Sequence, residues 1–420
     1  MTDMHFIKGA TLAGTSGRSQ DVFNPATGLV VGTVPLASAS EVDTAVAAAK
    51  AALPGWANTP PAKRAQTMFK FRELINQNLD KLAGLISAQH GKTLDDARGE
   101  VARGLEVVEF ACGIPHLLKG EYSAQVASGV DSYSLRQPVG VVAGITPFNF
   151  PAMVPMWMFP MALACGNTFI LKPSERDPGA PLYLAQLLGE AGLPDGCLNV
   201  VNGDKEAVDA ILDHPDIAAV SFVGSTAIGK YIYGRGCGNG KRVQALCGAK
   251  NHMIVVPDAD LNSTAKGLLA SSMGSAGQRC MAASVAIGVA NIDPIVDQLI
   301  VEAKNFILGK DMGTIISKEA LGRITNYINE AEEMGARILI DGRNPNPPKD
   351  YENGYWLGPT ILDNVKENWS CAKEEIFGPV LSIIRTNDLE GAMKIENNNP
   401  YGNAAAVFTT SGEVAKTISE

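Results

Sequence analysis

The sequence predicts an α/β protein with a Rossmann-type parallel sheet, followed by a second α/β domain. In the middle of the chain, apolar runs alternate with helical stretches, and the runs cover residues 140–146, 168–172, 197–202 and 218–223. Continuous apolar strands separated by helices are typical of a parallel sheet that is covered by helices on both faces. The same alternation begins again near residue 242.

The first third of the chain is predicted to be mainly helical after a short N-terminal strand region. Ser40 and Glu41 mark one helix start, because a hydroxyl cap and an acidic first turn both stabilise the first turn of a helix. Apolar residues at helical spacing predict helices over 39–50, 61–79, 81–90 and 94–110. Further helices over 154–164, 181–191 and 205–214 connect the strands of the middle third.

The pattern also predicts how the chain divides into domains. Residues 1–123 and 139–246 form the first predicted domain, and residues 247–420 form the second. The stretch 124–138 mixes polar and apolar residues partly in alternation, which predicts an exposed hairpin whose edge can pair with another chain. The remaining predicted strands are 242–247, 253–256, 285–289, 338–340 and 380–385, and the remaining helices are 263–273, 294–308 and 318–333.

Composition and charge favour an enzyme that acts on a small molecule. The 420 residues include 44 acidic and 35 basic side chains, so the net charge is −9, and no basic block occurs. This argues against nucleic acid or an anionic membrane as the main partner. Residues 137–171 carry no charge, but five prolines interrupt them, so we predict a buried strand, loop and helix rather than a membrane span.

The cysteines favour a reduced, cytoplasmic protein without a metal site. There are seven cysteines, an odd number, and no pair has the C-x-x-C spacing. The five histidines form no H-x-x-x-H pair. A disulfide scaffold and a zinc site are therefore not expected. The first ten residues also lack the basic and apolar regions of a signal peptide.

Cys280 is the strongest candidate for a reactive residue. It ends the stretch Gly274-Ser275-Ala276-Gly277-Gln278-Arg279-Cys280, whose small residues would allow a substrate to approach closely. A thiolate is a strong nucleophile at neutral pH, and the adjacent Arg279 is expected to favour the anion. The alternative is that Cys280 is a small buried apolar residue, as most free cysteines are.

Three other segments carry residues suited to a nucleotide or an oxyanion. Phe222–Gly229 runs from an apolar strand through glycine and serine into a predicted helix, a turn that can present backbone N–H groups to phosphate. Lys172 and Glu175 follow a strand end, where they can hold ribose hydroxyls. Asn149 lies in the rigid segment Pro147–Pro151 and can donate to an oxyanion. Each signal is weak alone, because ordinary turns and loops use the same residues.

Together these segments resemble the aldehyde dehydrogenase superfamily over nearly the whole chain. Five motifs occur in the family's order and at about its spacing, namely Pro147–Pro151, Leu171–Glu175, Phe222–Gly229, Gly277–Cys280 and Glu375–Pro379. The resemblance implies an aldehyde dehydrogenase-like fold with a Rossmann-type NAD-binding domain, a catalytic domain and a small oligomerisation hairpin. It also implies a homo-oligomer, either a dimer or a tetramer.

The chain is more closely similar to the CoA-acylating methylmalonate-semialdehyde dehydrogenase branch. This resemblance rests on residues 103–120, 137–162, 248–252 and 277–282. It implies NAD-dependent oxidation of methylmalonate or malonate semialdehyde through a thioester on Cys280. Coenzyme A is then the co-substrate, and decarboxylation gives propionyl-CoA or acetyl-CoA. A place in valine or inositol catabolism is implied as well.

The resemblance also implies roles for further residues. Asn149 and the backbone N–H of Cys280 would form the oxyanion hole, and Arg103 and Arg279 would hold the substrate carboxylate. A carboxylate at Glu175 favours NAD, because it would repel the 2′-phosphate of NADP, although the neighbouring Arg176 weakens this preference. The positions implied to bind NAD are Phe148, Lys172, Glu175, Arg176, Ser225 and Glu375.

One departure from the family pattern is chemically informative. Leu246 occupies the position where hydrolytic members carry a glutamate that activates water, and where the acylating branch usually has an asparagine. A hydrocarbon cannot act as a base, which favours transfer of the acyl group to CoA. Two alternatives stay open. One is a hydrolytic dehydrogenase in which another base replaces Leu246, and the other is an inactive, truncated cofactor-binding protein, because the family's catalytic domain continues beyond the position of Glu420.

Overall fold

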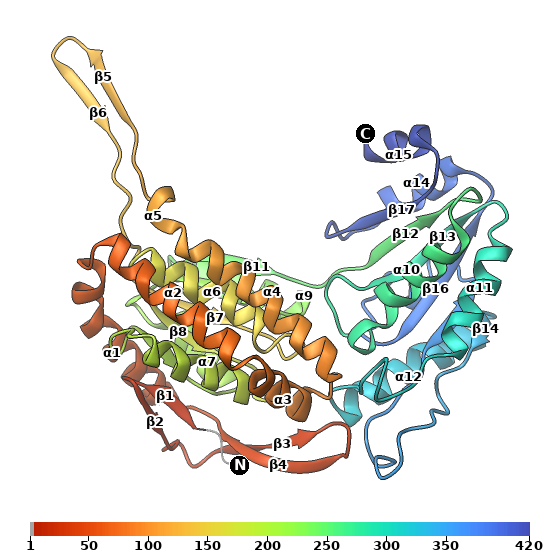
Figure 1. Ribbon diagram of the computed structural model, residues 1–420, viewed down its shortest axis with the longest axis horizontal. Helices are drawn as coiled ribbons and strands as arrows, with labels where there is room; N and C mark the ends of the chain where they lie inside the picture. Colours follow the sequence, from red (N-terminus) through yellow and green to blue (C-terminus); the bar gives the residue numbers. More distant parts are fainter. Residues whose placement is uncertain (1–3) are drawn as a thin grey trace. The chain divides into compact units, whose positions relative to one another are not determined.

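The computed structural model describes residues 4–420, which form two compact units (Figure 1). One unit contains the residues up to Phe23, Val30–Gln89 and Ala97–Cys247. The other contains Asn24–Leu29, His90–Asp96 and Gly248–Glu420. The predicted boundary after residue 246 lies one residue before this division, and two short segments of the N-terminal third group with the second unit.

The first unit is built on a mostly parallel sheet of seven strands in the order β11-β10-β7-β8-β9-β1-β2. The chain runs from β7 through β8 to β9 on one side, then returns to place β10 against the other side of β7. At one edge, β1 pairs antiparallel with both β9 and β2. The strands are β1 (His5–Ile7), β2 (Ala10–Leu12), β7 (Val141–Ile145), β8 (Thr168–Lys172), β9 (Leu198–Val200), β10 (Ile217–Val223) and β11 (Arg242–Leu246).

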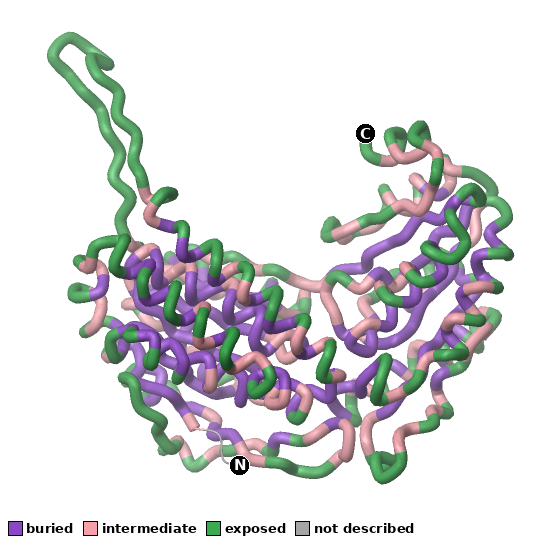
Figure 2. The backbone as a smooth tube through the Cα atoms, viewed as in Figure 1, coloured by how far each residue is buried: buried purple, intermediate pink, exposed green. Residues whose placement is uncertain are grey.

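Alternating side chains of this sheet enter two separate cores. Val142 and Phe169 pack with α2, α6 and α7, whereas Ala143 and Ile170 belong to the cluster that includes α1, α8 and α9. Figure 2 shows the buried strands between these helices. The helices of this unit are α1 (Ala39–Ala57), α2 (Pro61–Gln77), α3 (Leu79–His90), α4 (Leu94–Cys112), α5 (Ile114–Leu117), α6 (Met153–Ala164), α7 (Gly179–Glu190), α8 (Lys205–Asp213) and α9 (Thr226–Gly238).

Local chemistry explains where α1 begins and how far it extends. Its N-cap is Ser38 rather than the predicted Ser40, because Glu41 at the third helical position accepts a hydrogen bond from the Ser38 backbone N–H at 2.8 Å. The helix continues through Pro54 to Ala57, beyond the predicted end at residue 50. Buried apolar residues along α1, such as Val46 and Trp56, hold this extension against the unit.

Two small sheets accompany the main sheet. The strands β5 (Tyr122–Ala127) and β6 (Val130–Tyr133) form a hairpin that begins two residues before the predicted stretch 124–138, and every residue of both strands is exposed. This hairpin projects from the helices of its own unit (Figure 1). The strands β3 (Ser19–Asn24) and β4 (Leu29–Pro35) form the other pair.

The second unit contains a six-stranded sheet in the order β14-β15-β16-β13-β12-β17. All neighbouring strands are parallel except β14 and β15. The strands are β12 (Asn251–Val255), β13 (Ala283–Val289), β14 (Arg337–Ile340), β15 (Thr360–Asp363), β16 (Val380–Thr386) and β17 (Ala405–Phe408). The helices are α10 (Leu261–Met273), the 3₁₀ turn η1 (Gly274–Gly277), α11 (Asp293–Lys304), α12 (Lys318–Glu333), α13 (Ser370–Lys373), α14 (Leu389–Asn397) and α15 (Gly412–Ser419).

The predicted α/β class and Rossmann-type sheet are confirmed. The uncharged stretch 137–171 supplies β7, α6 and most of β8, as its interrupting prolines predicted. Within residues 4–420, no helix combines the length and the apolar character needed to cross a membrane.

Candidate active site

The carboxyl edge of the first sheet carries the predicted nucleotide-binding residues except Glu375, which belongs to the second unit. Strand order reverses between β7 and β10, and open parallel sheets bind ligands outside the strand ends at such a reversal. At the end of β8, the Lys172 side chain is almost fully buried and its Nζ lies 3.2 Å from Glu175 Oε2. Glu175 and Arg176 are only partly buried, so their charged groups remain accessible to a ligand. This arrangement fits the ribose hydroxyls of a dinucleotide.

The turn after β10 fits a phosphate group. Ser225 is exposed and serves as the N-cap of α9, a helix of 13 residues. A helix N-terminus of this kind presents backbone N–H groups and a partial positive charge to an anion. Gly229 lets α9 approach β11, because a Cβ at this position would lie 2.2 Å from Cys247 Sγ. The donor set at this edge therefore fits NAD.

The loop after β7 contains Phe148 and Asn149, and Asn149 is only 4% exposed. Glu100 of α4 anchors the far end of this loop. Its Oε1 accepts hydrogen bonds from the backbone N–H groups of Ala152 at 2.8 Å and Met153 at 3.1 Å. Sequence reasoning missed Glu100, because its partners lie about fifty residues away and an acidic helix residue is usually solvated.

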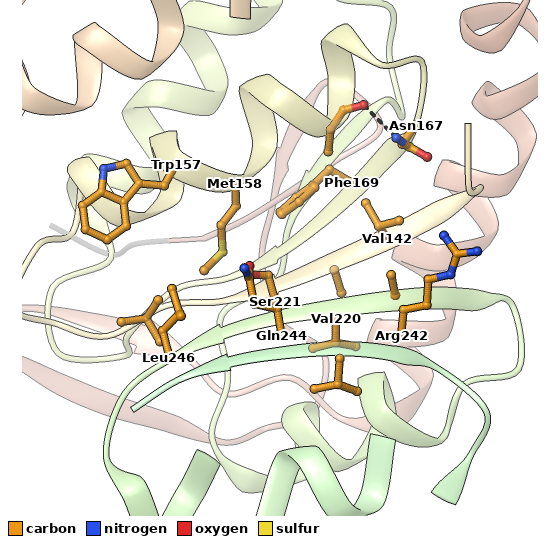
Figure 3. A pocket seen from close by; sticks show the side chains of 15 residues that line it. Val142, Trp157, Met158, Asn167, Phe169, Val220, Ser221, Arg242, Gln244 and Leu246 are labelled. Atoms are coloured by element: carbon orange, nitrogen blue, oxygen red, sulfur yellow. Dashed lines mark hydrogen bonds between the residues drawn. The ribbon is translucent and has the colours of Figure 1, made fainter. Parts of the chain in front are cut away.

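A pocket of about 410 Å³ lies on one face of this sheet (Figure 3). Leu246 lines one end with Trp157 and Met158, and Arg242 lies at the other end. Between these two ends of the pocket, Gln244 accepts a hydrogen bond from Ser221 Oγ at 3.2 Å. Most of the lining is apolar, and the Leu246 side chain is itself 46% exposed.

Arg103, a predicted ligand of the substrate carboxylate, is on α4. Its side chain is 73% exposed, and Nη1 lies 3.6 Å from Glu106 Oε2 on the same helix. An exposed pair of this kind holds its partner weakly. The Arg103 guanidinium can therefore bind another carboxylate in place of Glu106 with little loss of free energy.

In the second unit, Cys280 lies between η1 and β13 in a loop with unusual backbone geometry. Ser275 and Ala276 have φ of 53° and 52°, and Gly277 follows with φ of 68°. A Cβ at Gly277 would lie 2.0 Å from the carbonyl oxygen of Gly378. Only glycine therefore allows the Cys280 loop to approach the Glu375–Pro379 segment so closely.

Gln278 fixes the same loop from inside the unit. Its Nε2 donates to the Thr314 carbonyl at 2.9 Å, and its Oε1 accepts from the Ile316 backbone N–H at 3.0 Å. The side chain is 1% exposed. Both the donor and the acceptor of the Gln278 amide make hydrogen bonds, so this buried polar side chain holds the loop in place without leaving an unpaired polar group.

The surroundings of the Cys280 thiol raise its pKa. Burial contributes most, the nearby Glu375 carboxylate adds to it, and the backbone N–H groups of Cys280 and Met281 oppose it. The prediction that Arg279 favours the Cys280 thiolate is therefore wrong. Arg279 instead directs its guanidinium to Asp96, with Nη2 2.6 Å from Oδ1, while Asp96 Oδ2 accepts the Ser275 backbone N–H at 3.2 Å.

Glu375 is the partly buried carboxylate beside this loop. Its Oε1 accepts the Ala249 backbone N–H at 3.3 Å. Burial raises the pKa of Glu375, whereas this hydrogen bond and the charges of Lys250 and Arg323 oppose the rise. Among residues 4–420, no group of three acidic, histidine or cysteine side chains is arranged to hold a metal ion.

Comparison with known proteins decides the family. The aldehyde dehydrogenase family model matches residues 12–420. The chain belongs to the aldehyde dehydrogenase family. Its Cys280 loop, Glu375 segment and carboxyl-edge residues all lie within the matched range.

Named relatives in this family are similar over almost the whole chain. A malonate-semialdehyde dehydrogenase of Pseudomonas aeruginosa is 50% identical over 99% of this chain and 85% of its own length. A human mitochondrial protein, named as an acylating methylmalonate-semialdehyde/malonate-semialdehyde dehydrogenase, is 50% identical over 98% of this chain and 78% of its own.

A solved aldehyde dehydrogenase structure has nearly the same fold. A Sinorhizobium meliloti protein, assigned as a methylmalonate-semialdehyde dehydrogenase and complexed with NAD, superposes with a TM-score of 0.98. It is 52% identical, and the match covers 100% of this chain and 87% of that one.

Proposed function

We propose that this aldehyde dehydrogenase catalyses NAD-dependent, CoA-acylating oxidation of methylmalonate semialdehyde or malonate semialdehyde. The products are propionyl-CoA or acetyl-CoA, together with CO₂ and NADH. The observation that carries the proposal is the 50% identity to a named acylating relative over 98% of the chain. The donor set at the sheet edge and the hydrocarbon at Leu246 support the same activity.

The chain's own residues supply the covalent chemistry. The Cys280 thiol loses its proton and the sulfur attacks the aldehyde carbon, while the carbonyl electron pair moves to oxygen. Asn149 and the Cys280 backbone N–H stabilise that oxyanion. Bound NAD provides the acceptor for the hydride that the carbon then loses. A thioester on Cys280 results. The residues that would hold the cofactor are Phe148, Lys172, Glu175, Arg176, Ser225 and Glu375.

Decarboxylation and acyl transfer complete the cycle. Arg103 and Arg279 hold the substrate carboxylate, for which the planar guanidinium is well suited. The bond between this carboxylate and the adjacent substrate carbon breaks to release CO₂, and that adjacent carbon takes a proton. The CoA thiolate then attacks the thioester carbonyl and expels the Cys280 thiolate, which takes up a proton to become the thiol again. Leu246 cannot deprotonate water, so hydrolysis does not compete.

We also propose a homo-oligomer, either a dimer or a tetramer, in which the hairpin is a contact surface. Its exposed Tyr122, Val126 and Tyr133 support this role. The seven cysteines are free, which supports a reducing, cytoplasmic compartment. Valine or inositol catabolism is the pathway we propose.

Trapping the thioester tests the proposed function. Incubation with NAD and malonate semialdehyde, without CoA, is expected to give a burst of about one NADH per chain and an acyl adduct on the Cys280 peptide. Cys280→Ser is expected to give neither, whereas Cys237→Ser, at an exposed cysteine, keeps both. NADH formation by Cys280→Ser at the wild-type rate would refute the nucleophile.

A further inference from the structure

The carbonyl oxygen of Cys280 accepts two side-chain amide hydrogen bonds. Asn251 Nδ2 donates to it at 2.9 Å from the start of β12, and Asn403 Nδ2 donates at 3.0 Å from the segment before β17. These two asparagines lie more than 150 residues apart in sequence, yet they converge on one peptide group. Neither was predicted as a site residue.

The two asparagines also brace one another through the backbone. Asn251 Nδ2 donates to the Ala282 carbonyl at 3.0 Å as well as to Cys280, and its Oδ1 accepts the Ala404 backbone N–H at 3.1 Å. Asn251 is 3% exposed, so its amide is held inside the unit. Asn403 is exposed and approaches the same carbonyl from the surface.

This carbonyl belongs to the peptide that joins Cys280 to Met281. The N–H of that peptide is one of the two backbone donors that lower the pKa of the Cys280 thiol. Hydrogen bonds donated to a carbonyl polarise the peptide, which makes its N–H a stronger donor. The amide hydrogens of Asn251 and Asn403 are thus connected to Cys280 Sγ through a single peptide group.

We propose that Asn251 and Asn403 are positioning residues that polarise the Cys280–Met281 peptide and thereby stabilise the Cys280 thiolate. The inference rests on the proposed role of Cys280 as nucleophile. The charged group that acts on the thiol from its surroundings is the carboxylate of Glu375, which opposes ionisation. Arg279 is the adjacent cation in sequence, and it is paired with Asp96. The two amides therefore oppose the effect of the Glu375 carboxylate on the thiol.

The test measures the ionisation of Cys280 without any substrate. The rate of alkylation of the Cys280 peptide by iodoacetamide is followed from pH 6 to pH 11 by mass spectrometry. Asn403→Leu is expected to slow alkylation at pH 8 by about threefold, with an unchanged plateau at high pH, because the thiol pKa rises. Asn403→Asp is expected to slow it further, since it adds a negative charge. Asn397→Leu, at an exposed asparagine ending α14, is the matched control and should match the wild type.

Two outcomes would overturn the inference. One is an unchanged pH profile in both Asn403 variants. The other is a lower plateau with an unchanged midpoint, which would mean that Asn403 only orders the loop. Asn403 is on the surface, so these variants keep the test decisive even if substitution of the buried Asn251 prevents folding. Because no aldehyde, NAD or CoA is present, failure here is distinguishable from failure of the proposed function.

Discussion

At the scale of single residues, the thiol and its neighbours are tuned by burial more than by paired charges. Burial raises the pKa of Cys280, and the same effect lowers the pKa of the nearby Lys250 to about 8. The Lys250 side chain is 2% exposed, and its Nζ has no hydrogen-bond partner. Electrostatic contact with Cys371, Glu375 and Glu374 only partly offsets the cost of burying this charge.

Replacement of Lys250 is expected to stabilise the fold near neutral pH. Its pKa of about 8 lies below the ordinary 10.5, so the unfolded chain binds this proton more tightly. Stability therefore rises as pH increases from about 8 to 10.5. Lys250→Met should raise the free energy of unfolding at pH 7 by up to about 3 kcal/mol. This difference between the variant and the wild type should become smaller as the pH approaches 10.

Urea unfolding at pH 7 and pH 10 measures this difference. Lys266→Met, at an exposed lysine of α10, is the control and should change stability little at either pH. A Lys250→Met protein that is less stable than the wild type at pH 7 would mean that the ammonium makes a stabilising contact.

Leu246 offers a second prediction at this scale. A glutamate there would supply the missing base for water, so Leu246→Glu is expected to raise CoA-independent turnover of malonate semialdehyde by about tenfold or more. Leu246→Gln has nearly the same shape without the base and should leave that rate unchanged. Equal CoA-independent rates in the two variants would contradict the explanation based on the missing base.

At the scale of elements, α1 shows how one carboxylate holds several backbone groups. Partial burial opposes ionisation of Glu41, but hydrogen bonds from the Ser38 and Thr15 backbone N–H groups lower its pKa to about 2. The Thr15 bond is 2.6 Å long, so the residue caps its own helix and also holds the segment before it. His5 Nε2 lies 3.5 Å away on β1.

Glu41→Gln is expected to destabilise the protein most above pH 4.5. The folded pKa of about 2 lies below the ordinary 4.5, so the stabilisation is complete above pH 4.5 and disappears as pH falls toward 2. The loss at pH 7 should be about 1–3 kcal/mol by urea unfolding. A difference between variant and wild type that stays constant from pH 7 to pH 3 would disprove the role of the charge.

Elements with strong periodicity could be predicted, and short or irregular ones could not. The strand at 168–172 and the helix at 318–333 are observed within those bounds, because their apolar patterns are continuous. β15 and β17 have four residues each and were missed, since their strand structure depends on neighbours distant in sequence. Asn251 and Asn403 escaped prediction for the same reason, because only folding brings them to the Cys280 carbonyl.

At the scale of the whole molecule, the exposed hairpin is a candidate for association. Its two strands pair with each other, and all their residues are exposed to solvent. Their apolar side chains are therefore not buried by the rest of the unit. Replacement of residues 123–132 by a short turn is therefore expected to lower the molecular mass in solution without changing the unfolding midpoint. Light scattering at several concentrations measures the mass. An unchanged mass would exclude the hairpin as the contact surface.

The most direct test of the proposed function measures NADH formation from malonate semialdehyde and NAD, with and without CoA. The products in the reaction mixture are then identified by mass spectrometry. We predict sustained turnover only when CoA is present, with acetyl-CoA as the product. Sustained turnover without CoA, giving a free acid, would contradict the acylating function and favour a hydrolytic aldehyde dehydrogenase.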